Sequence, residues 1–307
     1  MARRHVDCGD MTARLGFGFK VGHWTHPTSE TGCTVILPPP GNTASCDIRG
    51  ASPGSRELVQ LHPNRRLTEI HGVLLTGGSA FGLAAAHGVM EWLAERDVGY
   101  KTPVATIPIV PAAVVFDLSV ASPESRPGPN EGRSACEAAT EGGVATGRVG
   151  AGAGATVGKW AGLEYLTPGG IGIGRAEQDR YAVSAIAVVN AVGDVLAEDG
   201  SIIAGSTSPT PRWVIRPRAE RGLPTNTVLA VVATDAPLDK REMRWLAARG
   251  SDGVTRTIRP AHTPYDGDVT FAITAPADEG SPPDLDILGP LAADAVADAV
   301  RNAVVRS

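Results

Sequence analysis

Residues 222–234 read Gly-Leu-Pro-Thr-Asn-Thr-Val-Leu-Ala-Val-Val-Ala-Thr, and the rest of the chain is arranged around them. Upstream, from about Ser206, the sequence is rich in Pro, Arg and Ser, which is typical of a loop. From Val228 it becomes apolar and β-branched, which predicts a buried strand. Thr227 therefore stands at the mouth of a predicted core strand, at the end of a loop.

The Asn226-Thr227 junction makes a particular chemistry possible. If the bond between these residues broke, Thr227 would carry both a hydroxyl and a free α-amine, which together are a nucleophile and its base. The alternative is that Asn-Thr simply begins a strand, as such dipeptides often do. The dipeptide alone leaves both interpretations open.

The composition indicates a globular protein with a sizeable core. The 307 residues are 42% hydrophobic and 20% charged, which allows one large domain or two ordinary ones. The net charge of −5 argues against a general nucleic-acid surface. With no signal peptide and no apolar run near 18 residues, we expect a cytoplasmic protein without a membrane span. Free thiols are expected for the four cysteines, which lack metal-binding spacing: Cys8, Cys33, Cys46 and Cys136.

Strands and helices are predicted to alternate without a regular strand-helix-strand repeat. We expect strands over residues 34–37, 73–76, 182–192, 228–233 and 268–274, and helices over 83–96, 133–146, 238–249, 252–260 and 285–305. Residues 1–32 are expected to be irregular and 41–66 to be rich in turns. This pattern favours an α+β fold, a layered αββα sandwich, in a single domain.

A glycine-rich run, Gly150-Ala-Gly-Ala-Gly-Ala-Thr-Val-Gly158, ends at Lys159. It is not a phosphate-binding P-loop, because Ala153 stands where the motif requires its first glycine and Trp160 where it requires Ser or Thr. Close backbone approach around Lys159 is the remaining interpretation. Such a lysine is either solvated, as most are, or partly buried on a stiff glycine scaffold.

The segment Gly77-Gly78-Ser79-Ala80-Phe81 resembles the nucleophile elbow of serine hydrolases. Phe81 occupies the position of the second glycine, which the strained elbow needs. A structural or substrate-lining turn at a helix start fits better. We take Gly78, Ser79 and Phe81 as candidate substrate-binding residues.

Three further polar residues stand at strand ends. Asn190 ends a buried strand and is either a turn residue or an amide donor for an oxyanion. Asp266 and Asp268 flank Gly267 just before a strand. They form either an exposed turn or a carboxylate pair that orients an amine or hydroxyl.

The order of these segments closely resembles one family, the DmpA-type aminopeptidases and nylon-oligomer hydrolases, which are self-processing N-terminal-nucleophile hydrolases. The most specific pieces are Asn226-Thr227 with its strand and His262-Thr-x-x-Asp-Gly-Asp268. Further matching segments extend the resemblance over nearly the whole chain: Val21-Gly-His23, Thr31-Gly-Cys-Thr-Val-Ile-Leu37 and Leu75-Thr-Gly-Gly-Ser-Ala-Phe-Gly-Leu83. Phe81 departs from relatives that often have Tyr there.

The resemblance implies an αββα sandwich built of two chains from one precursor. It makes Thr227 the nucleophile and Asn226-Thr227 the self-cleavage bond, giving an α subunit of residues 1–226 and a β subunit of 227–307. Lys159, Asn190, Asp266 and Asp268 fall where the nylon-hydrolase branch has its catalytic helpers. The implied assembly is a homo-oligomer, a tetramer of αβ units.

The implied function is hydrolysis of a small peptide or amide oligomer, without metal or organic cofactor, nucleic acid or membrane. Two alternatives remain open. The chain could be an acyl transferase similar to ornithine acetyltransferase, which is also self-cleaving before Thr. It could also be an uncleaved binding protein that uses the glycine-rich pocket.

Overall fold

Two five-stranded sheets form the centre of the computed structural model, which describes residues 12–28, 30–210, 212–213, 226–275 and 283–304. The first sheet has the order β13 (Gly170–Gln178), β14 (Tyr181–Asn190), β17 (Thr227–Thr234), β19 (Val269–Thr274), β4 (Thr43–Ile48). The second has the order β2 (Lys20–Thr25), β3 (Gly32–Leu37), β6 (Val73–Thr76), β9 (Ala112–Val114), β5 (Ser55–Arg56).

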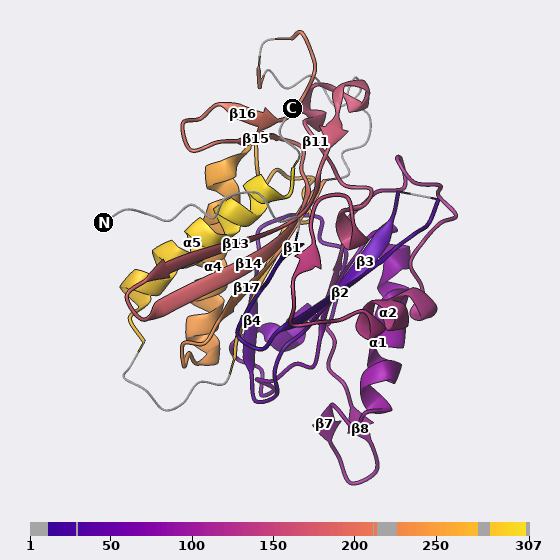
Figure 1. Cartoon of the computed structure of the whole chain (residues 1–307), viewed down its shortest axis with the longest axis vertical. Coiled ribbons are helices and arrows are strands. Elements are labelled where there is room, and N and C mark those ends of the chain that lie inside the picture. The colour runs from indigo at the N-terminus through magenta and orange to yellow at the C-terminus, as the bar shows by residue number, and fades with distance from the viewer. Residues whose placement is uncertain (1–11, 29, 211, 214–225, 276–282, 305–307) are drawn as a thin grey trace.

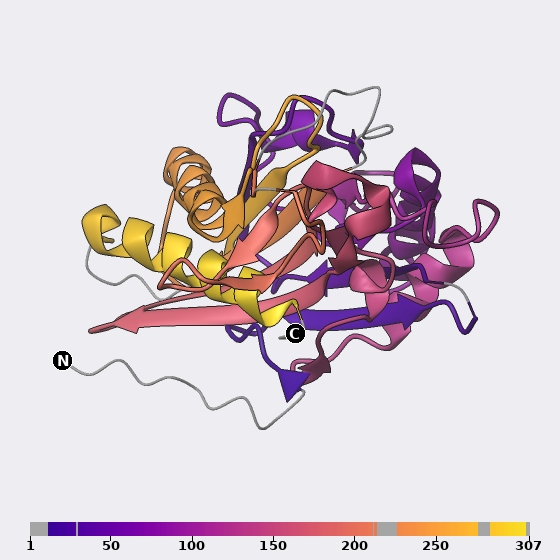
Figure 2. The same ribbon diagram turned by 90° about the horizontal axis from the view of Figure 1, so that it is seen from above.

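Helices cover the outer face of each sheet, as Figure 1 shows and Figure 2 repeats from above. The first sheet carries α4 (Lys240–Thr257) and α5 (Leu285–Asn302), and the second carries α1 (Ala85–Ala94) and α2 (Pro129–Glu137). A third apolar cluster lies between the sheets and joins residues of both, including Ile36, Leu75, Ile186 and Leu229. The layers are therefore helix, sheet, sheet, helix, which confirms the predicted αββα sandwich.

Strand β17 shows how the sequence specifies these layers. Val228, Ala230 and Val232 pack toward α4 and α5, while Leu229, Val231 and Ala233 pack toward the second sheet. A strand buried on both faces has the continuous apolar sequence seen here. Because successive side chains alternate between faces, Thr227 belongs to the side that faces the second sheet.

The neighbours of β17 come from both sides of position 227 in the sequence. It pairs antiparallel with β14, where Thr227 lies opposite Asn190, and parallel with β19. The far edge of β19 pairs with β4. The sheet thus interleaves strands from before and after Thr227, so a break before Thr227 would leave the two pieces hydrogen-bonded to each other.

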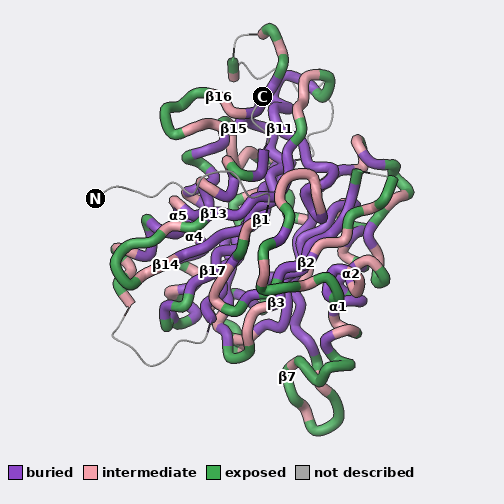
Figure 3. The backbone as a smooth tube through the Cα atoms, viewed as in Figure 1, coloured by how far each residue is buried: buried purple, intermediate pink, exposed green. Residues whose placement is uncertain are grey.

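Smaller sheets complete the fold. Beside the glycine-rich run lies a three-stranded sheet of β16 (Ile202–Ala204), β15 (Asp194–Leu196) and β18 (Ile258–Arg259). Three pairs of short strands are β1 (Thr12–Ala13) with β10 (Val144–Ala145), β11 (Thr156–Val157) with β12 (Thr167–Pro168), and β7 (Tyr100–Lys101) with β8 (Thr106–Ile107). The burial map shows the central strands covered and the β7 hairpin exposed (Figure 3).

Several expected boundaries were wrong. The helix expected over residues 133–146 is α2, Pro129–Glu137, because Pro129 can start a helix while Gly142 and Gly143 do not continue one. The short helix expected over 252–260 is the end of α4, which begins at an Asp239–Glu242 capping box. β2 and β4 lie in regions expected to be irregular or turn-rich, because their polar residues masked the strand pattern.

Other expectations fall partly outside the described residues. Cys33, Cys46 and Cys136 are buried free thiols, whereas Cys8 lies outside the described residues. The same holds for most of the Pro-rich loop before Thr227, residues 214–225. Among the described helices, none combines the length and apolar character needed to cross a lipid bilayer.

Candidate active site

Thr227 is the first residue of β17 and lies almost completely buried, with 6% of its surface exposed. Its Oγ1 donates a hydrogen bond to the carbonyl oxygen of Asn226, at an O–O distance of 2.5 Å. The hydroxyl is thus turned back onto the peptide bond that precedes it. This is the bond that the sequence predicts to be cut.

A loop before β19 holds the same carbonyl from another direction. The backbone N–H of Gly267 donates to the Asn226 oxygen at 3.0 Å, and Asn226 and Asp266 form a parallel bridge. A Cβ at position 267 would lie 2.9 Å from Thr227 Oγ1 and 3.0 Å from the Ser52 oxygen. Only glycine therefore lets this N–H approach the carbonyl beside the hydroxyl.

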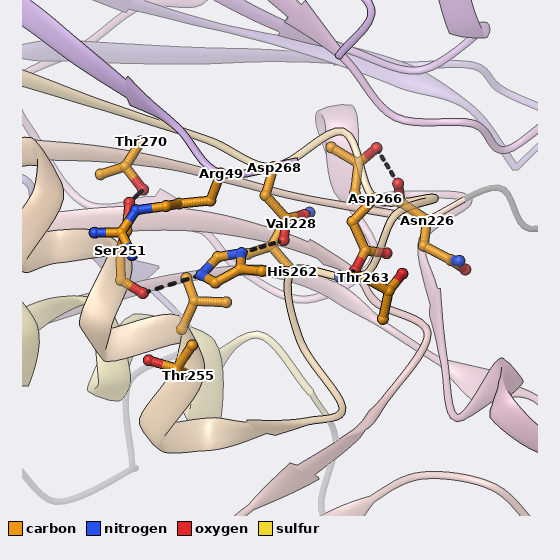
Figure 4. A network of polar contacts seen from close by, with 12 residues as sticks. Arg49, Asn226, Val228, Ser251, Thr255, His262, Thr263, Asp266, Asp268 and Thr270 are labelled. Carbon is orange, nitrogen blue, oxygen red and sulfur yellow. Dashed lines mark hydrogen bonds and ion pairs between the residues drawn. The ribbon is translucent and has the colours of Figure 1, made fainter. Parts of the chain in front are cut away.

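Asp268 fixes the backbone that follows Thr227. Its Oδ1 accepts a hydrogen bond from the N–H of Val228 at 2.6 Å. Its Oδ2 lies 2.6 Å from Nδ1 of His262 (Figure 4). Both oxygens of this buried carboxylate are therefore engaged by donors, as buried charged groups require.

Asp266 has a different environment. Its Oδ2 accepts the N–H of Thr263 at 2.5 Å, but its buried Oδ1 has no hydrogen-bond partner in the described part of the chain. Burial, together with repulsion from Asp268, raises the pKa of the Asp266 carboxyl to about 6. Figure 4 shows Asp266 beside Asn226, so a carboxyl that titrates near neutral pH adjoins the predicted cleavage bond.

Lys159 is buried, which settles the choice between a solvated and a partly buried lysine. Its Nζ donates to Oδ1 of Asn190 at 2.8 Å and to the Asn190 backbone oxygen at 3.2 Å. Burial lowers the pKa of Lys159 to about 7, although the charge of Asp266 opposes the shift. Gly158 precedes it at a φ of 76°, where a Cβ would lie 2.1 Å from the Ser206 nitrogen. The glycine scaffold thus permits the close packing that buries Lys159.

Asn190 links Lys159 to the nucleophile strand. It lies opposite Thr227 in the β14–β17 ladder. Its Oδ1 accepts from Lys159 and from the N–H of Thr156, at 3.0 Å for the latter, and its Nδ2 donates to the Phe116 oxygen at 3.2 Å. Because two donors converge on Oδ1, the orientation of the amide is fixed. In this chain Oδ1 of Asn190 accepts a hydrogen bond from Lys159, and the carbonyl oxygen of Asn226 accepts one from Gly267.

The structure thus brings the predicted catalytic residues together from four places in the sequence. Pairing, hydrogen bonds and the charge interaction of Lys159 with Asp266 connect the cluster of Lys159, Asn190, Asn226, Thr227, Asp266 and Asp268. A buried hydroxyl, a lysine titrating near pH 7 and a carboxyl titrating near pH 6 are groups that can exchange a proton near neutral pH.

The candidate substrate-binding turn has its own carboxylate, Asp117. The N–H of Gly78 donates to Asp117 Oδ1 at 2.8 Å, and the Thr31 hydroxyl donates to Oδ2 at 2.7 Å. Gly78 and Ser79 both have positive φ angles, 79° and 54°. The turn reaches the cluster only indirectly, because Phe116, next to Asp117, accepts the amide of Asn190.

Phe81 lies on the surface beyond that turn. It is 61% exposed, and the guanidinium carbon of Arg126 lies 4.0 Å from its ring centroid. A role for Phe81 in binding substrate stays a prediction.

Sequence reasoning missed two residues of this region. Asp117 lies in the apolar run of residues 112–118, and a lone carboxylate in such a run was the available signal. His262 opens the motif His-Thr-x-x-Asp-Gly-Asp but received no role, because spacing alone does not show that its ring reaches Asp268.

The chain is similar to known proteins over most of its length. The profile of Peptidase family S58 matches residues 17–307. A protein named uncharacterized aminopeptidase from Mycobacterium tuberculosis is 37% identical, with 94% of this chain and 92% of the relative covered. A 6-aminohexanoate-oligomer endohydrolase from Kocuria sp. (strain KY2) is 31% identical, with 87% of this chain and 76% of the relative covered.

Solved structures share the fold at lower identity. A beta-aminopeptidase from Burkholderia sp. superposes with a TM-score of 0.70 at 21% identity, over 97% of this chain and 88% of the other. The l-aminopeptidase d-ala-esterase/amidase from Ochrobactrum anthropi is described as a variant of the Ntn hydrolase fold. It also superposes with a TM-score of 0.70 at 21% identity, over 93% of this chain and 83% of the other. With a profile match over nearly its whole length and relatives above 30% identity, the chain belongs to peptidase family S58.

Proposed function

We propose that the protein is a self-processing amide hydrolase whose nucleophile is Thr227. The observation that carries the proposal is the pair of contacts on one carbonyl oxygen. Thr227 Oγ1 lies 2.5 Å from the Asn226 oxygen, and the N–H of Gly267 lies 3.0 Å from it. A hydroxyl held against its own preceding carbonyl, with a backbone donor on the oxygen, is the arrangement that an intramolecular attack needs.

The proposed cleavage proceeds through an ester between Asn226 and the Thr227 side chain. Thr227 Oγ attacks the carbonyl carbon of Asn226, and its proton passes to a nearby base, for which Lys159 is the candidate because its pKa near 7 leaves much of it neutral. The developing oxyanion is stabilised by the Gly267 N–H. The C–N bond then breaks, the departing nitrogen takes a proton, and an ester joins Asn226 to the Thr227 side chain. Water hydrolyses that ester.

The products are a chain ending in the Asn226 carboxylate and a chain beginning with Thr227, residues 1–226 and 227–307. In the mature enzyme the new α-amine accepts the hydroxyl proton. An ordinary α-amine has a pKa of about 7.7–8.0, so a large part is neutral near pH 8. Asp266 and Asp268 orient this amine and Lys159. The sequence-based role of Asn190 is to stabilise the substrate oxyanion, for which its Nδ2, with two N–H groups, is the donor.

The proposed substrates are small peptides or linear amide oligomers. The relatives are named for aminopeptidase and 6-aminohexanoate-oligomer hydrolase activity, and both reactions break an amide by the same acyl-transfer chemistry. Transfer of the acyl group to ornithine instead of water would use the same nucleophile. No feature of the described site favours that alternative.

A panel assay tests the proposal. Amino-acyl nitroanilides, short peptides and aminohexanoate oligomers are incubated with wild-type protein and with Thr227→Ala, and an acetyl-ornithine acceptor assay runs in parallel. We expect amide hydrolysis by wild type and none by the variant. Equal hydrolysis by both proteins, or acetyl transfer without hydrolysis, contradicts the assignment.

The assembly of the mature enzyme stays a prediction. We propose a closed homo-oligomer, a tetramer of αβ units, as the sequence resemblance implies. The apolar face of α5, including Leu288, Val296 and Val300, packs on its own sheet. The β7–β8 hairpin is the better place to look, since Tyr100 and Val104 are exposed there. Light scattering of Val104→Asp against wild type tests this surface.

A further inference from the structure

His262 lies between β18 and the loop that carries Asp266 and Asp268. Its side chain is 13% exposed, and its φ is 52°, in the left-handed region that non-glycine residues seldom adopt. Such a backbone persists only where surrounding contacts hold it. Here both ring nitrogens have acceptors, Asp268 Oδ2 at 2.6 Å from Nδ1 and the Ser251 oxygen at 3.4 Å from Nε2.

These contacts lead from α4 to the residue that follows the proposed nucleophile, and Figure 4 shows His262 between Ser251 and Asp268. The Ser251 oxygen on α4 orients the ring, the ring holds Asp268 Oδ2, and Asp268 Oδ1 holds the N–H of Val228. Val228 is bonded directly to Thr227. A rotation of the Asp268 carboxylate would therefore shift the backbone beside the attacking hydroxyl.

We propose that His262 is a positioning residue for the nucleophile. By holding one oxygen of Asp268, it fixes the other oxygen on the Val228 amide and so fixes the backbone that carries Thr227. The inference rests on the proposed function of Thr227. It adds a residue that does not touch the cleavage bond.

His262 is the charged partner of Asp268, because the nearby Arg49 pairs with other carboxylates. Arg49, the residue that follows β4, lies close enough for its charge to act on the ring, but its Nε donates to Asp47 at 2.6 Å and its Nη2 lies 3.7 Å from Asp252. Asp266 is also close to these groups. The charge of Asp268 raises the pKa of Asp266, and the charge of His262 lowers it. Without His262, Asp268 would lose the donor on Oδ2, and a buried carboxylate oxygen without a donor is costly.

The geometry also indicates the charge on the ring. A neutral imidazole has one N–H, so donation to both Asp268 and Ser251 requires the protonated form. Burial would lower the pKa of His262, but the hydrogen bond and charge of Asp268 outweigh it, and the pKa lies above the ordinary value of 6.5. The link to Asp268 is therefore strongest at neutral and lower pH.

Two substitutions separate the hydrogen bond from the backbone conformation. Glycine and asparagine both tolerate a positive φ, but only asparagine keeps an N–H donor near the position of Nδ1. We expect His262→Gly to slow self-cleavage by about 10-fold or more and His262→Asn to remain several-fold faster than His262→Gly, at similar melting temperatures. Equal rates for wild type and His262→Gly, or equal losses in both variants, overturn the proposal.

A second readout does not depend on cleavage. In the Thr227→Ala background, hydrogen exchange of the Val228 amide is followed by NMR, with the Ala230 amide of the same strand as control. We expect His262→Gly to raise exchange at Val228 by about 10-fold or more and His262→Asn to restore most of the protection, with Ala230 unchanged. Unchanged exchange at Val228 in His262→Gly contradicts the role of His262, even if Thr227 proves to be no nucleophile. If the exchange pattern is as expected but the wild-type protein does not cleave itself, only the proposed function is contradicted.

Discussion

Two lysines of this protein are buried to the same extent, Lys159 with 6% and Lys240 with 7% of their surface exposed. Burial lowers the pKa of both. Lys240 donates to three backbone oxygens of one loop, those of Gln60, Arg65 and Leu67. Lys159 instead contacts Asn190 and interacts with the charge of Asp266. Lys240 thus attaches a loop, whereas Lys159 lies in the cluster for which we propose proton transfer.

Two buried carboxylates differ in the same way. Each oxygen of Asp117 accepts a hydrogen bond, from Gly78 and from Thr31, so this carboxylate ties the glycine turn to its surroundings. Asp266 has one buried oxygen without a partner in the described residues and lies next to a second carboxylate. The hydrogen bonding of its two oxygens, more than burial alone, thus separates Asp266 from the structural carboxylate Asp117.

The largest expected effect comes from exchanging each lysine for methionine, which keeps most of the buried volume. Lys159→Met should slow self-cleavage by about 10²–10⁴-fold, the range for loss of a general base, and turnover should fall with it because the α-amine forms only on cleavage. Lys240→Met should leave turnover nearly unchanged and lower the free energy of unfolding by about 2–3 kcal/mol, since it leaves buried carbonyls without a donor. Fragment formation on gels and thermal melts measure both. If the two variants lose activity equally, the distinction between the lysines is wrong.

The carboxylates give a smaller contrast. Asp266→Asn should slow turnover by about 10–100-fold through misplacement of the amine, while the melting temperature stays the same or rises. Asp117→Asn should lower stability by about 1–3 kcal/mol, because an amide N–H₂ would face one of the two donors, and should alter turnover little. If Asp266→Asn lowered the melting temperature more than Asp117→Asn did, Asp266 would be the structural carboxylate of the two.

The raised pKa of Asp266 also predicts a pH-dependent stability. Since the folded-state pKa, about 6, exceeds the ordinary 3.8, the contribution of this group is present below pH 3.8 and is lost as the pH rises through 6. Denaturant titrations of wild type and Asp266→Asn between pH 4 and 7 should show the variant gaining relative to wild type with rising pH. If the unfolding free energies of the two proteins changed in parallel with pH, the raised pKa of Asp266 would be contradicted.

Self-cleavage should respond to pH through Lys159. Only neutral Lys159 accepts a proton, and its pKa lies near 7. The rate should therefore rise about tenfold per pH unit below 7 and level off above it. Time courses of precursor disappearance from pH 5.5 to 8.5 measure this. A rate that is flat or falls over that range would exclude Lys159 as the base.

The smallest effect is expected at Phe81, which lies outside the polar cluster. Phe81→Ala should raise KM by a few-fold at most and leave self-cleavage unchanged, because the ring is exposed and the turn is held by Asp117 instead. Steady-state kinetics beside a processing gel measure both quantities. Loss of processing in this variant would place Phe81 nearer the nucleophile than its exposure indicates.

The sequence predicted the layers and the cluster better than the boundaries. An apolar run rich in β-branched residues, such as β17, predicts a buried strand, and the family resemblance grouped Lys159, Asn190, Thr227, Asp266 and Asp268. Strand β4 was missed because its polar residues are satisfied by tertiary partners: Ser45 donates to Leu61, and Asp47 pairs with Arg49 and Arg244. Likewise the ring of His262 and the donor role of Gly267 depend on backbone angles and distances that residue spacing does not encode.

Intact-mass spectrometry of the purified wild-type protein, with N-terminal sequencing of any small fragment, tests the central claim most directly. The account predicts two fragments, with the smaller beginning at Thr227. Thr227→Ala should remain one chain of 31.7 kDa, and Thr227→Ser should still be cut because its hydroxyl is retained. An active wild-type enzyme that remains a single chain, or a fragment that begins at any other residue, would contradict it.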